Sequence, residues 1–120
     1  MLIVKEGKIL GVTRKNDTSK YGLPGGKVDI GETAKEAAIR ETLEETNILV
    51  KECDFFFSKE ETSSNETYCT YCYYATVWEG DPKALEAGKV DWISTEDLMK
   101  GSFPIYNKCV IDKMRNEGLI

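Results

Sequence analysis

Residues 25–45 read GGKVDIGETAKEAAIRETLEE, a stretch that joins a glycine pair to a segment crowded with carboxylates. The spacing predicts a helix over residues 33–46, because Thr33 can cap its start and Glu36 completes a capping box. Asn47 follows where a helix often ends in a left-handed turn, which is a conformation that asparagine tolerates. We therefore expect one short helix with both ends defined by its own neighbours.

When the helix is drawn at about 100° per residue, its small and acidic residues fall on one face. Three alanines and three glutamates share this face: Ala34, Ala37, Ala38, Glu41, Glu44 and Glu45. Ile39 and Leu43 lie on the far side, so we expect these two residues to pack against the core. The small alanines leave room for another group to approach the helix backbone.

The glutamates of this helix stand three and four residues apart, where like charges repel one another. A divalent cation would remove the repulsion, because Mg²⁺ prefers hard oxygen ligands and commonly links carboxylates to phosphate oxygens. An exposed acidic helix balanced by Lys35 and Arg40 is the other interpretation that the helix alone leaves open.

The composition limits both the size of the protein and its chemistry. A length of 120 residues with 41% apolar residues predicts one folded domain over residues 1–120. The net charge of -5 argues against nucleic acid as a partner. The sequence has no histidine, so acid–base chemistry must use carboxylates, lysine, tyrosine or metal-bound water. Residues 1–8 fit neither a signal peptide nor a membrane span, so we expect a cytoplasmic protein with no membrane partner.

The order of strand and helix signals predicts an α+β or α/β sandwich. The expected strands are residues 1–5, 8–14, 48–58, 67–78 and 89–93. The expected helical segments are residues 33–46, 94–98 and 104–117. Residues 16–21 and 59–66 are polar and are expected to form loops, residues 51–54 interrupt the third strand, and Glu6-Gly7 supplies a turn.

Two further patterns are expected to serve packing. Cys69 and Cys72 lie in a strand-like run, where a spacing of three residues points their side chains to opposite faces and disfavours a metal or redox site. The last helix carries a stripe of residues at helical spacing that we expect to join the core: Ile105, Cys109, Val110 and Met114.

Residues 26–48 resemble the Nudix box, the sequence signature of the Nudix hydrolase family. The positions that match the family pattern are Gly26, Glu32, Arg40, Glu41, Glu44, Glu45 and Ile48. Two positions depart from it, because Thr42 stands at an apolar position and Asn47 at a glycine position. Neither change touches a charged position, and YGLPGG at residues 21–26 is also typical of the family.

This resemblance implies a Nudix fold, in which a mixed β-sheet lies between helices. It also implies hydrolysis of a nucleoside diphosphate linked to another moiety, with Mg²⁺ or Mn²⁺ as cofactor. Glu44 and Glu45 would be direct metal ligands, and Glu41 would be a further ligand or would orient the attacking water. The carbonyl group of Gly25 or Gly26 would supply another ligand. Arg40 would hold a carboxylate in place, and Glu32 would bind metal through water or steady the loop.

The substrate is less sharply defined than the reaction. VWEGDP at residues 77–82 resembles MutT-type enzymes, which cleave nucleoside triphosphates to monophosphates, and Asp81 would be the acidic residue that approaches the metal ions. Glu79 is the neighbour to consider, and an ordinary turn is the alternative for this segment. Arg14 and Lys27 are candidates for phosphate contacts, and Tyr21 is a candidate for stacking on a base.

Three functions remain open at this point. The first is hydrolysis of nucleoside triphosphates, including oxidised ones, and the second is hydrolysis of ADP-ribose, a dinucleoside polyphosphate or a nucleotide sugar. The sequence leans toward the first, because the next proline after the box is Pro82, whereas ADP-ribose enzymes often have one sooner. The third is a non-catalytic nucleotide-binding module, although such modules usually lose glutamates that this sequence keeps. The sequence leaves open whether the protein is a monomer or a homodimer.

Overall fold

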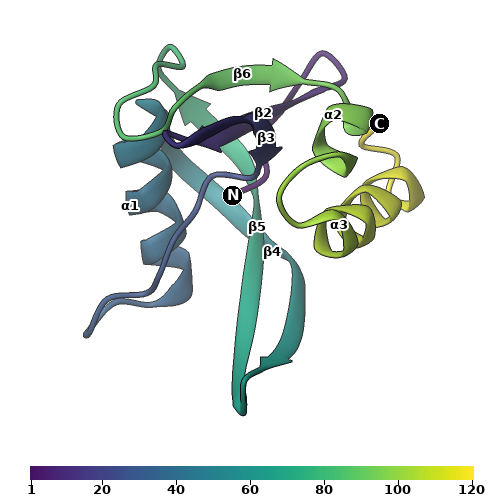
Figure 1. Ribbon diagram of the computed structural model, residues 1–120. Coiled ribbons are helices and arrows are strands. Elements are labelled where there is room, and N and C mark those ends of the chain that lie inside the picture. Colours follow the sequence, from purple (N-terminus) through teal and green to yellow (C-terminus); the bar gives the residue numbers. More distant parts are fainter.

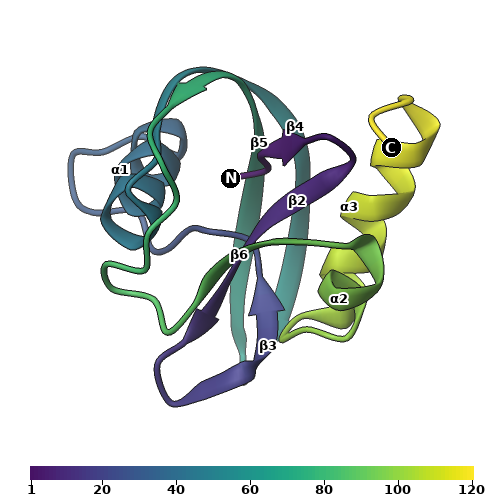
Figure 2. The ribbon, with the colours of Figure 1, turned by 90° about the horizontal axis from the view of Figure 1, so that it is seen from above.

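The computed structural model describes residues 1–120 except for the side chain of residue 63. Helix α1 (Ala34–Thr46) covers one side of the strands, and helices α2 (Thr95–Met99) and α3 (Pro104–Asn116) cover the other (Figures 1 and 2). The strands are β1 (Val4–Lys5), β2 (Lys8–Arg14), β3 (Asp17–Gly22), β4 (Leu49–Ser63), β5 (Glu66–Glu79) and β6 (Val90–Ile93). None of the described helices is long and apolar enough to cross a membrane.

The strands form two sheets that the first residues of the chain connect. Strand β2 pairs antiparallel with β1, β3 and β6, and strand β4 pairs antiparallel with β5. Leu2 forms a parallel bridge to β5, because its N–H donates to the Tyr73 carbonyl at 2.8 Å and its carbonyl accepts from the Ala75 N–H at 2.9 Å. The expected α+β fold, with mixed strand directions between helices, is therefore confirmed.

Two of the expected loops are strands in the structure, so those predictions are wrong. Residues 17–22 form β3, and residues 59–66 belong to the long hairpin of β4 and β5. Ser64 and Asn65 form its turn with φ of 51° and 68°, as Glu6 and Gly7 do between β1 and β2 with 51° and 78°. Most side chains in both segments are exposed, so the alternation of apolar and polar residues that reveals a half-buried strand is missing.

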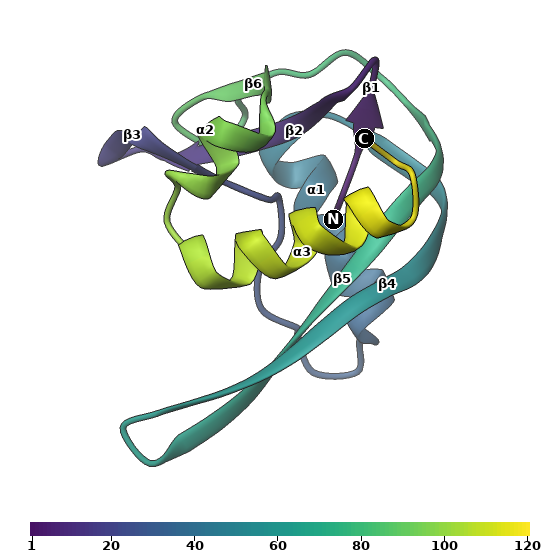
Figure 3. The ribbon, with the colours of Figure 1, turned by 90° about the vertical axis from the view of Figure 1, so that its right-hand side faces the viewer.

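The β4–β5 hairpin extends beyond the rest of the molecule. The interruption expected at residues 51–54 is absorbed by register shifts between Val50 and Cys53, so β4 continues to its turn. Residues 58–71 form the outer part, which we call the projecting ribbon (Figures 1 and 3). Their described side chains are exposed or half-buried.

The core has one cluster on each side of the strands. The cluster beside α2 and α3 contains Leu2, Ile9, Phe56, Cys72, Ile93, Leu98, Val110, Ile111 and Met114. The cluster beside α1 contains Met1, Ile3, Leu10, Ala38, Ile48, Val50, Cys53 and Ala75. Cys72 is buried and Cys69 is exposed, which confirms that the two side chains point to opposite faces.

The stripe predicted on α3 is correct only in part. Val110 and Met114 are fully buried, but Ile105 is 71% exposed and Cys109 is half-buried. Asn107 is buried on the core side instead, where its Nδ2 donates to the Leu98 carbonyl at 3.0 Å. Because its side-chain amide is hydrogen-bonded, the polar residue Asn107 can be buried at a position outside the predicted apolar stripe.

Candidate active site

Helix α1 begins and ends where the sequence predicts. The Glu36 N–H donates to Thr33 Oγ1 at 3.1 Å, and the Thr33 N–H donates to Glu36 Oε1 at 3.0 Å, so the capping box is complete. At the other end Asn47 adopts φ of 65°, and its N–H donates to the Leu43 carbonyl at 3.0 Å. These caps fix the position of the glutamates between them.

The orientation expected for α1 is wrong in part. The helix buries Ala37, Ala38, Thr42 and Thr46 against the strands. Leu43 is 40% exposed, whereas Ile39 is half-buried and packs against the core. The small alanines therefore allow the sheet, and not a ligand, to approach the backbone.

Two buried threonines take part in this contact. Thr42 Oγ1 donates to the Ala38 carbonyl at 2.7 Å, and Thr46 Oγ1 donates to the Thr42 carbonyl at 2.6 Å. Because both hydroxyl groups are paired within the helix, burial leaves neither unsatisfied. Thr42 can thus occupy a position where the family pattern has an apolar residue.

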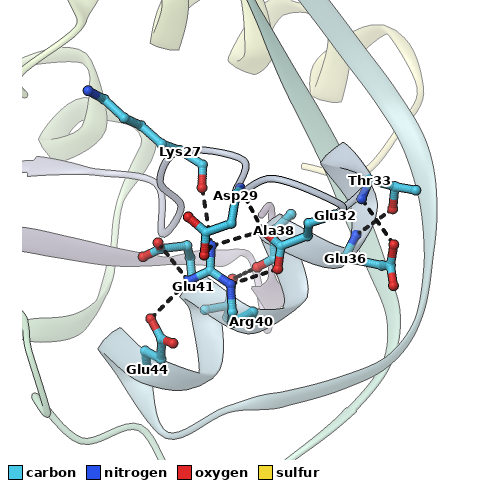
Figure 4. Close-up of polar contacts among 10 residues, drawn as sticks. Lys27, Asp29, Glu32, Thr33, Glu36, Ala38, Arg40, Glu41 and Glu44 are labelled. Atoms are coloured by element: carbon cyan, nitrogen blue, oxygen red, sulfur yellow. Dashed lines mark hydrogen bonds and ion pairs between the residues drawn. The ribbon is translucent and has the colours of Figure 1, made fainter.

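Arg40 donates hydrogen bonds to four groups, which are three carboxylates and one carbonyl group of the loop before α1 (Figure 4). Its Nε and Nη2 atoms donate to the two carboxylate oxygens of Glu32 at 2.7 and 3.0 Å. Its Nη1 atom donates to Glu41 at 2.9 Å and to Glu44 at 3.2 Å, and Nη2 also donates to the Lys27 carbonyl at 3.1 Å. The single guanidinium thereby connects the loop to the acidic face of the helix.

Glu32 is held within the loop by this arrangement. It also accepts from the Asp29 N–H at 3.0 Å, while the Asp29 carboxylate lies 3.3 Å from the guanidinium of Arg40. Hydrogen bonds from Arg40 lower the pKa of Glu32, and hydrogen bonds to Glu32 raise the pKa of Arg40. Of the two roles that the resemblance implies for Glu32, the geometry favours steadying the loop.

The glycine pair lies directly against two of the glutamates. The Gly25 N–H donates to Glu45 Oε1 at 2.9 Å. A Cβ atom on Gly26 would lie 2.5 Å from Glu41 Cδ, which is closer than atoms can approach without a shift. The family resemblance implied that the glycine pair and the glutamates share one site, and the structure brings them together.

Glu45 is half-buried beside the glycine pair. Burial raises its pKa, the Gly25 N–H lowers it, and the charges of Glu41 and Glu86 raise it further. Glu86 comes near because the Leu85 N–H donates to the Glu45 carbonyl at 3.1 Å. Sequence reasoning missed Glu86, since it lies in a segment with no regular structure and only this non-local contact brings it to the helix.

The two acidic residues predicted near the metal site lie in different surroundings. The Asp81 side chain is exposed, and its carbonyl group accepts from Asn47 Nδ2 at 3.1 Å beyond the end of α1. Glu79 forms an exposed ion pair with Lys51 at 3.0 Å. Glu86, another carboxylate of this loop, lies close enough to Glu45 for its charge to contribute to the raised pKa of Glu45.

The candidate substrate residues are distributed over the surface. Arg14 lines a cavity of about 310 Å³ with Asn16, Asp17, Lys20, Ser102 and Phe103, and none of the described lining residues belongs to α1. The Lys27 side chain is exposed. Tyr21 packs against the core, and its hydroxyl donates to Asp91 at 2.5 Å, which raises the pKa of Tyr21 to about 12.

The donor set suits a divalent cation. Five carboxylates surround the single guanidinium of Arg40, or lie beside the glycine pair: Asp29, Glu32, Glu41, Glu44 and Glu45. No three of the described side chains converge as ligands in their present rotamers. Excess negative charge on hard oxygens nevertheless matches the chemistry of such ions, and the Glu44 side chain is 41% exposed beside Arg40.

Comparisons with known proteins agree with this geometry. A family model described as NUDIX domain matches residues 1–114. The chain is 29% identical to an 8-oxo-dGTP diphosphatase of Escherichia coli over 118 residues, covering 95% of this chain and 92% of that protein. It is 33% identical to an ADP-ribose pyrophosphatase of Methanocaldococcus jannaschii over 119 residues, covering 95% and 70%. The crystal structure of a MutT NUDIX hydrolase from Burkholderia pseudomallei superposes with a TM-score of 0.78 at 26% identity, covering 93% and 92%.

Proposed function

The chain belongs to the Nudix hydrolase family, and from this premise we propose that it hydrolyses nucleoside triphosphates to a monophosphate and pyrophosphate. Relatives of the chain are named diphosphatases and pyrophosphatases of nucleotides, and Nudix hydrolases use divalent metal ions. The observation that carries the proposal is the acidic face of α1, where Arg40 binds Glu41 and Glu44 and the glycine pair lies against Glu45 and Glu41. We further propose Mg²⁺ or Mn²⁺ as the cofactor, one domain over residues 1–120, and a cytoplasmic location.

The residues of the site have separate roles in this proposal. Glu44 and Glu45 would hold the cation together with a carbonyl group of Gly25 or Gly26, and Asp81 or Glu86 would add a carboxylate from the loop after β5. When bound, the cation polarises phosphate oxygens and lowers the pKa of a coordinated water. Glu41 orients the attacking water or accepts its proton.

Positioning of these groups comes from hydrogen bonds already in the structure. The Gly25 N–H holds one oxygen of Glu45, which leaves the other oxygen for a ligand. Arg40 holds Glu41 at 2.9 Å and balances part of the negative charge. Correct placement of reacting groups contributes strongly to rate, so these contacts matter although neither touches the substrate. Arg14, Lys27 and Tyr21 are the proposed substrate contacts.

A second candidate is hydrolysis of ADP-ribose. The similarity to the Methanocaldococcus jannaschii pyrophosphatase supports it, since that relative shares 33% identity with nearly the whole chain. The Escherichia coli relative supports the triphosphate, and oxidised deoxyguanosine triphosphate in particular. Both reactions break a phosphoanhydride bond and would use the same carboxylates.

A substrate panel tests the proposal. The purified protein is incubated with Mg²⁺ or Mn²⁺ and with dGTP, 8-oxo-dGTP, CTP, ADP-ribose or a dinucleoside polyphosphate, and the products are separated by ion-exchange chromatography. Pyrophosphate together with a monophosphate supports the first candidate, and AMP together with ribose 5-phosphate supports the second. Tight nucleotide binding without turnover would instead identify a non-catalytic module.

A variant of Glu44 links the activity to the site. Glu44→Gln is expected to lower turnover by about a hundredfold or more, because it removes a charged ligand. The matched control is Glu52→Gln, which changes an exposed glutamate of β4 and should stay within about twofold of the wild type. Equal activity in the two variants would remove Glu44 from the metal site.

A further inference from the structure

The outer edge of β5 is open along the projecting ribbon. Strand β4 lies along one edge of β5 for its whole length, and Leu2 meets the other edge at Tyr73 and Ala75. Within the described part of the chain, no strand pairs with that second edge over residues 66–72. Figures 1 and 3 show that this part of the hairpin stands clear of the helices.

The hydrogen-bonding groups on this open edge belong to alternate residues. In a strand, the N–H and carbonyl groups of one residue point to the same edge, and those of the next residue point to the other. Tyr73 and Ala75 direct theirs toward Leu2, and β5 is paired residue by residue from Tyr73 back to its turn. The groups of Thr67, Cys69 and Tyr71 therefore point outward, with no partner strand in the described chain.

The two edges of the ribbon differ in charge. The outer edge of β4 carries Lys59, Glu60 and Glu61, which are charges of the kind that prevent one strand from adding to another. Residues 67–71 of β5 read TYCTY and include no aspartate, glutamate, lysine or arginine. Threonine and tyrosine also favour strands, and a two-stranded ribbon alone is only marginally stable in water. Of the two edges of the projecting ribbon, the β5 edge is therefore the one suited to accept another strand.

We propose that the β5 edge pairs antiparallel with the β5 edge of a second copy of this chain, about a two-fold axis at Cys69. The open edge is limited at one end by the turn at Asn65 and at the other by Leu2, which occupies the edge at Tyr73. Cys69 lies midway between these limits. In this register Cys69 faces Cys69 of the second copy, Thr67 faces Tyr71, and every outward N–H meets a carbonyl group.

The β5 seam is free of charged side chains, whereas the alternative edge is not. The β5 seam places no ionised side chain opposite a like charge, because residues 67–71 carry none. A corresponding two-fold pairing of the β4 edges about Glu60 would bring six charged side chains to the seam, with Glu60 opposite itself and Lys59 opposite Glu61 of the second copy. The proposed dimer joins the two ribbons into one four-stranded sheet, which does not depend on the hydrolase function.

Amide hydrogen exchange tests the seam directly. At high protein concentration the amides of Thr67, Cys69 and Tyr71 should exchange about tenfold or more slowly than after dilution. The amides of Tyr68 and Thr70 point toward β4 and serve as internal references that change less. Exchange of the three outward amides that is fast and independent of concentration would overturn the proposal.

Sedimentation of variants tests the register. Wild-type protein should approach twice the 13.5 kDa of the chain as its concentration rises. Cys69→Lys places like charges opposite each other and should give a monomer, while Ser58→Lys on the outer edge of β4 should remain a dimer. A monomeric wild type at every concentration, or a dimer that survives Cys69→Lys, would contradict this pairing.

Oxidation adds a geometric test. Directly opposite residues in a hydrogen-bonded antiparallel pair have Cα atoms about 5.5 Å apart, within the range of a disulfide. Diamide, which accepts the two electrons and two protons that a pair of thiols loses, should produce a covalent dimer from wild type and from Cys109→Ser. Cys69→Ser should form no covalent dimer but should still sediment as one. A cross-link that persists in Cys69→Ser would refute the two-fold axis.

Discussion

Arg40 and Glu32 form a paired contact, in which Nε donates to Oε2 at 2.7 Å and Nη2 donates to Oε1 at 3.0 Å. Glu32 belongs to the loop before α1, and Arg40 lies within that helix, eight residues later. The same guanidinium reaches Glu41 at 2.9 Å. One side chain therefore fixes the loop to the helix and orients a carboxylate of the candidate active site.

Replacement of Arg40 by lysine should separate these two contacts. A lysine has one nitrogen and cannot bind both oxygens of Glu32 while it also reaches Glu41. We expect Arg40→Lys to lower kcat/KM by about tenfold or more with the circular dichroism spectrum unchanged. Arg115→Lys, on the exposed surface of α3, is the control and should remain within about twofold of wild type. A wild-type rate in Arg40→Lys would show that the paired geometry is dispensable.

Gly26→Ala tests the close approach of the loop to Glu41. The new Cβ atom would lie 2.5 Å from Glu41 Cδ, so the carboxylate or the loop must move. A displacement of this size is expected to reduce kcat by about a hundredfold. Gly22→Ala is the control, because a Cβ atom there meets nothing within 4 Å, and its kcat should match wild type. Equal rates in the two variants would mean that Glu41 tolerates displacement.

The loop carboxylates Glu86 and Asp81 can be distinguished by paired variants. Glu86 acts on Glu45 through its charge, whereas the contact shown for Asp81 is its carbonyl group with Asn47. We expect Glu86→Gln to weaken activation by Mg²⁺ and to lower the rate by about tenfold or more. Asp81→Asn should have the smaller effect. Titration of the initial rate with Mg²⁺ measures both, and the reverse order would favour the carboxylate predicted from the sequence.

The hydrogen bond from Tyr21 to Asp91 should appear in the dependence of stability on pH. Tyr21 has a pKa of about 12 in the folded protein, mainly because its hydroxyl group donates a hydrogen bond to the Asp91 carboxylate. An unfolded tyrosine has a pKa of about 10, so the protonated form is favoured by folding. This contribution is complete below pH of about 10 and is lost as pH rises to about 12.

Denaturant unfolding of wild type and Tyr21→Phe at several pH values measures this effect. The advantage of wild type should be constant at neutral pH and should shrink between pH of about 10 and 12. Asp91→Asn, which removes the charge that retains the proton, brings the folded pKa of Tyr21 closer to its unfolded value and should therefore make the loss of stability above pH of about 10 smaller. A difference between wild type and Tyr21→Phe that stays constant over this range would contradict the assignment.

Local signals account for the parts of the fold that the sequence predicts well. The capping box of Thr33 and Glu36 and the left-handed turn at Asn47 depend on residues within a few positions of each other. Such contacts are present in any fold that contains the helix, so they can be read directly from the chain. The opposite orientation of Cys69 and Cys72 could be predicted in the same way, because the alternation of side chains along a strand depends on the backbone alone.

Tertiary contacts decided the elements that the sequence did not predict. Strand β3 and the outer part of β4 are polar on both faces, and their pairing with neighbours makes them strands. Leu43 is more hydrophobic than Ala37 but remains exposed, because the face of α1 that is buried against the sheet carries the small residues Ala37, Ala38, Thr42 and Thr46. Side-chain size at that contact overrode the apolar pattern.

Some residues of the candidate site could be predicted from local sequence, and others depend on tertiary contacts. The glutamates of α1 and Arg40 follow from their spacing on one helix and from the family resemblance. Glu86 could not be predicted, since its approach to Glu45 depends on the path of a segment that begins far along the chain. The roles of the predicted ligands and substrate contacts stay predictions until the variants above are measured.

The bridge from Leu2 to Tyr73 and Ala75 has a consequence for synthesis on the ribosome. The hydrogen bonds that connect the two sheets can form only after residue 75 has left the exit tunnel. Both capping residues of α1 are instead available as soon as the helix itself has emerged. The core around Leu2 also needs Val110 and Met114 from α3. A nascent chain halted before α3 would therefore expose this core to chaperones while its acidic helix was already capped.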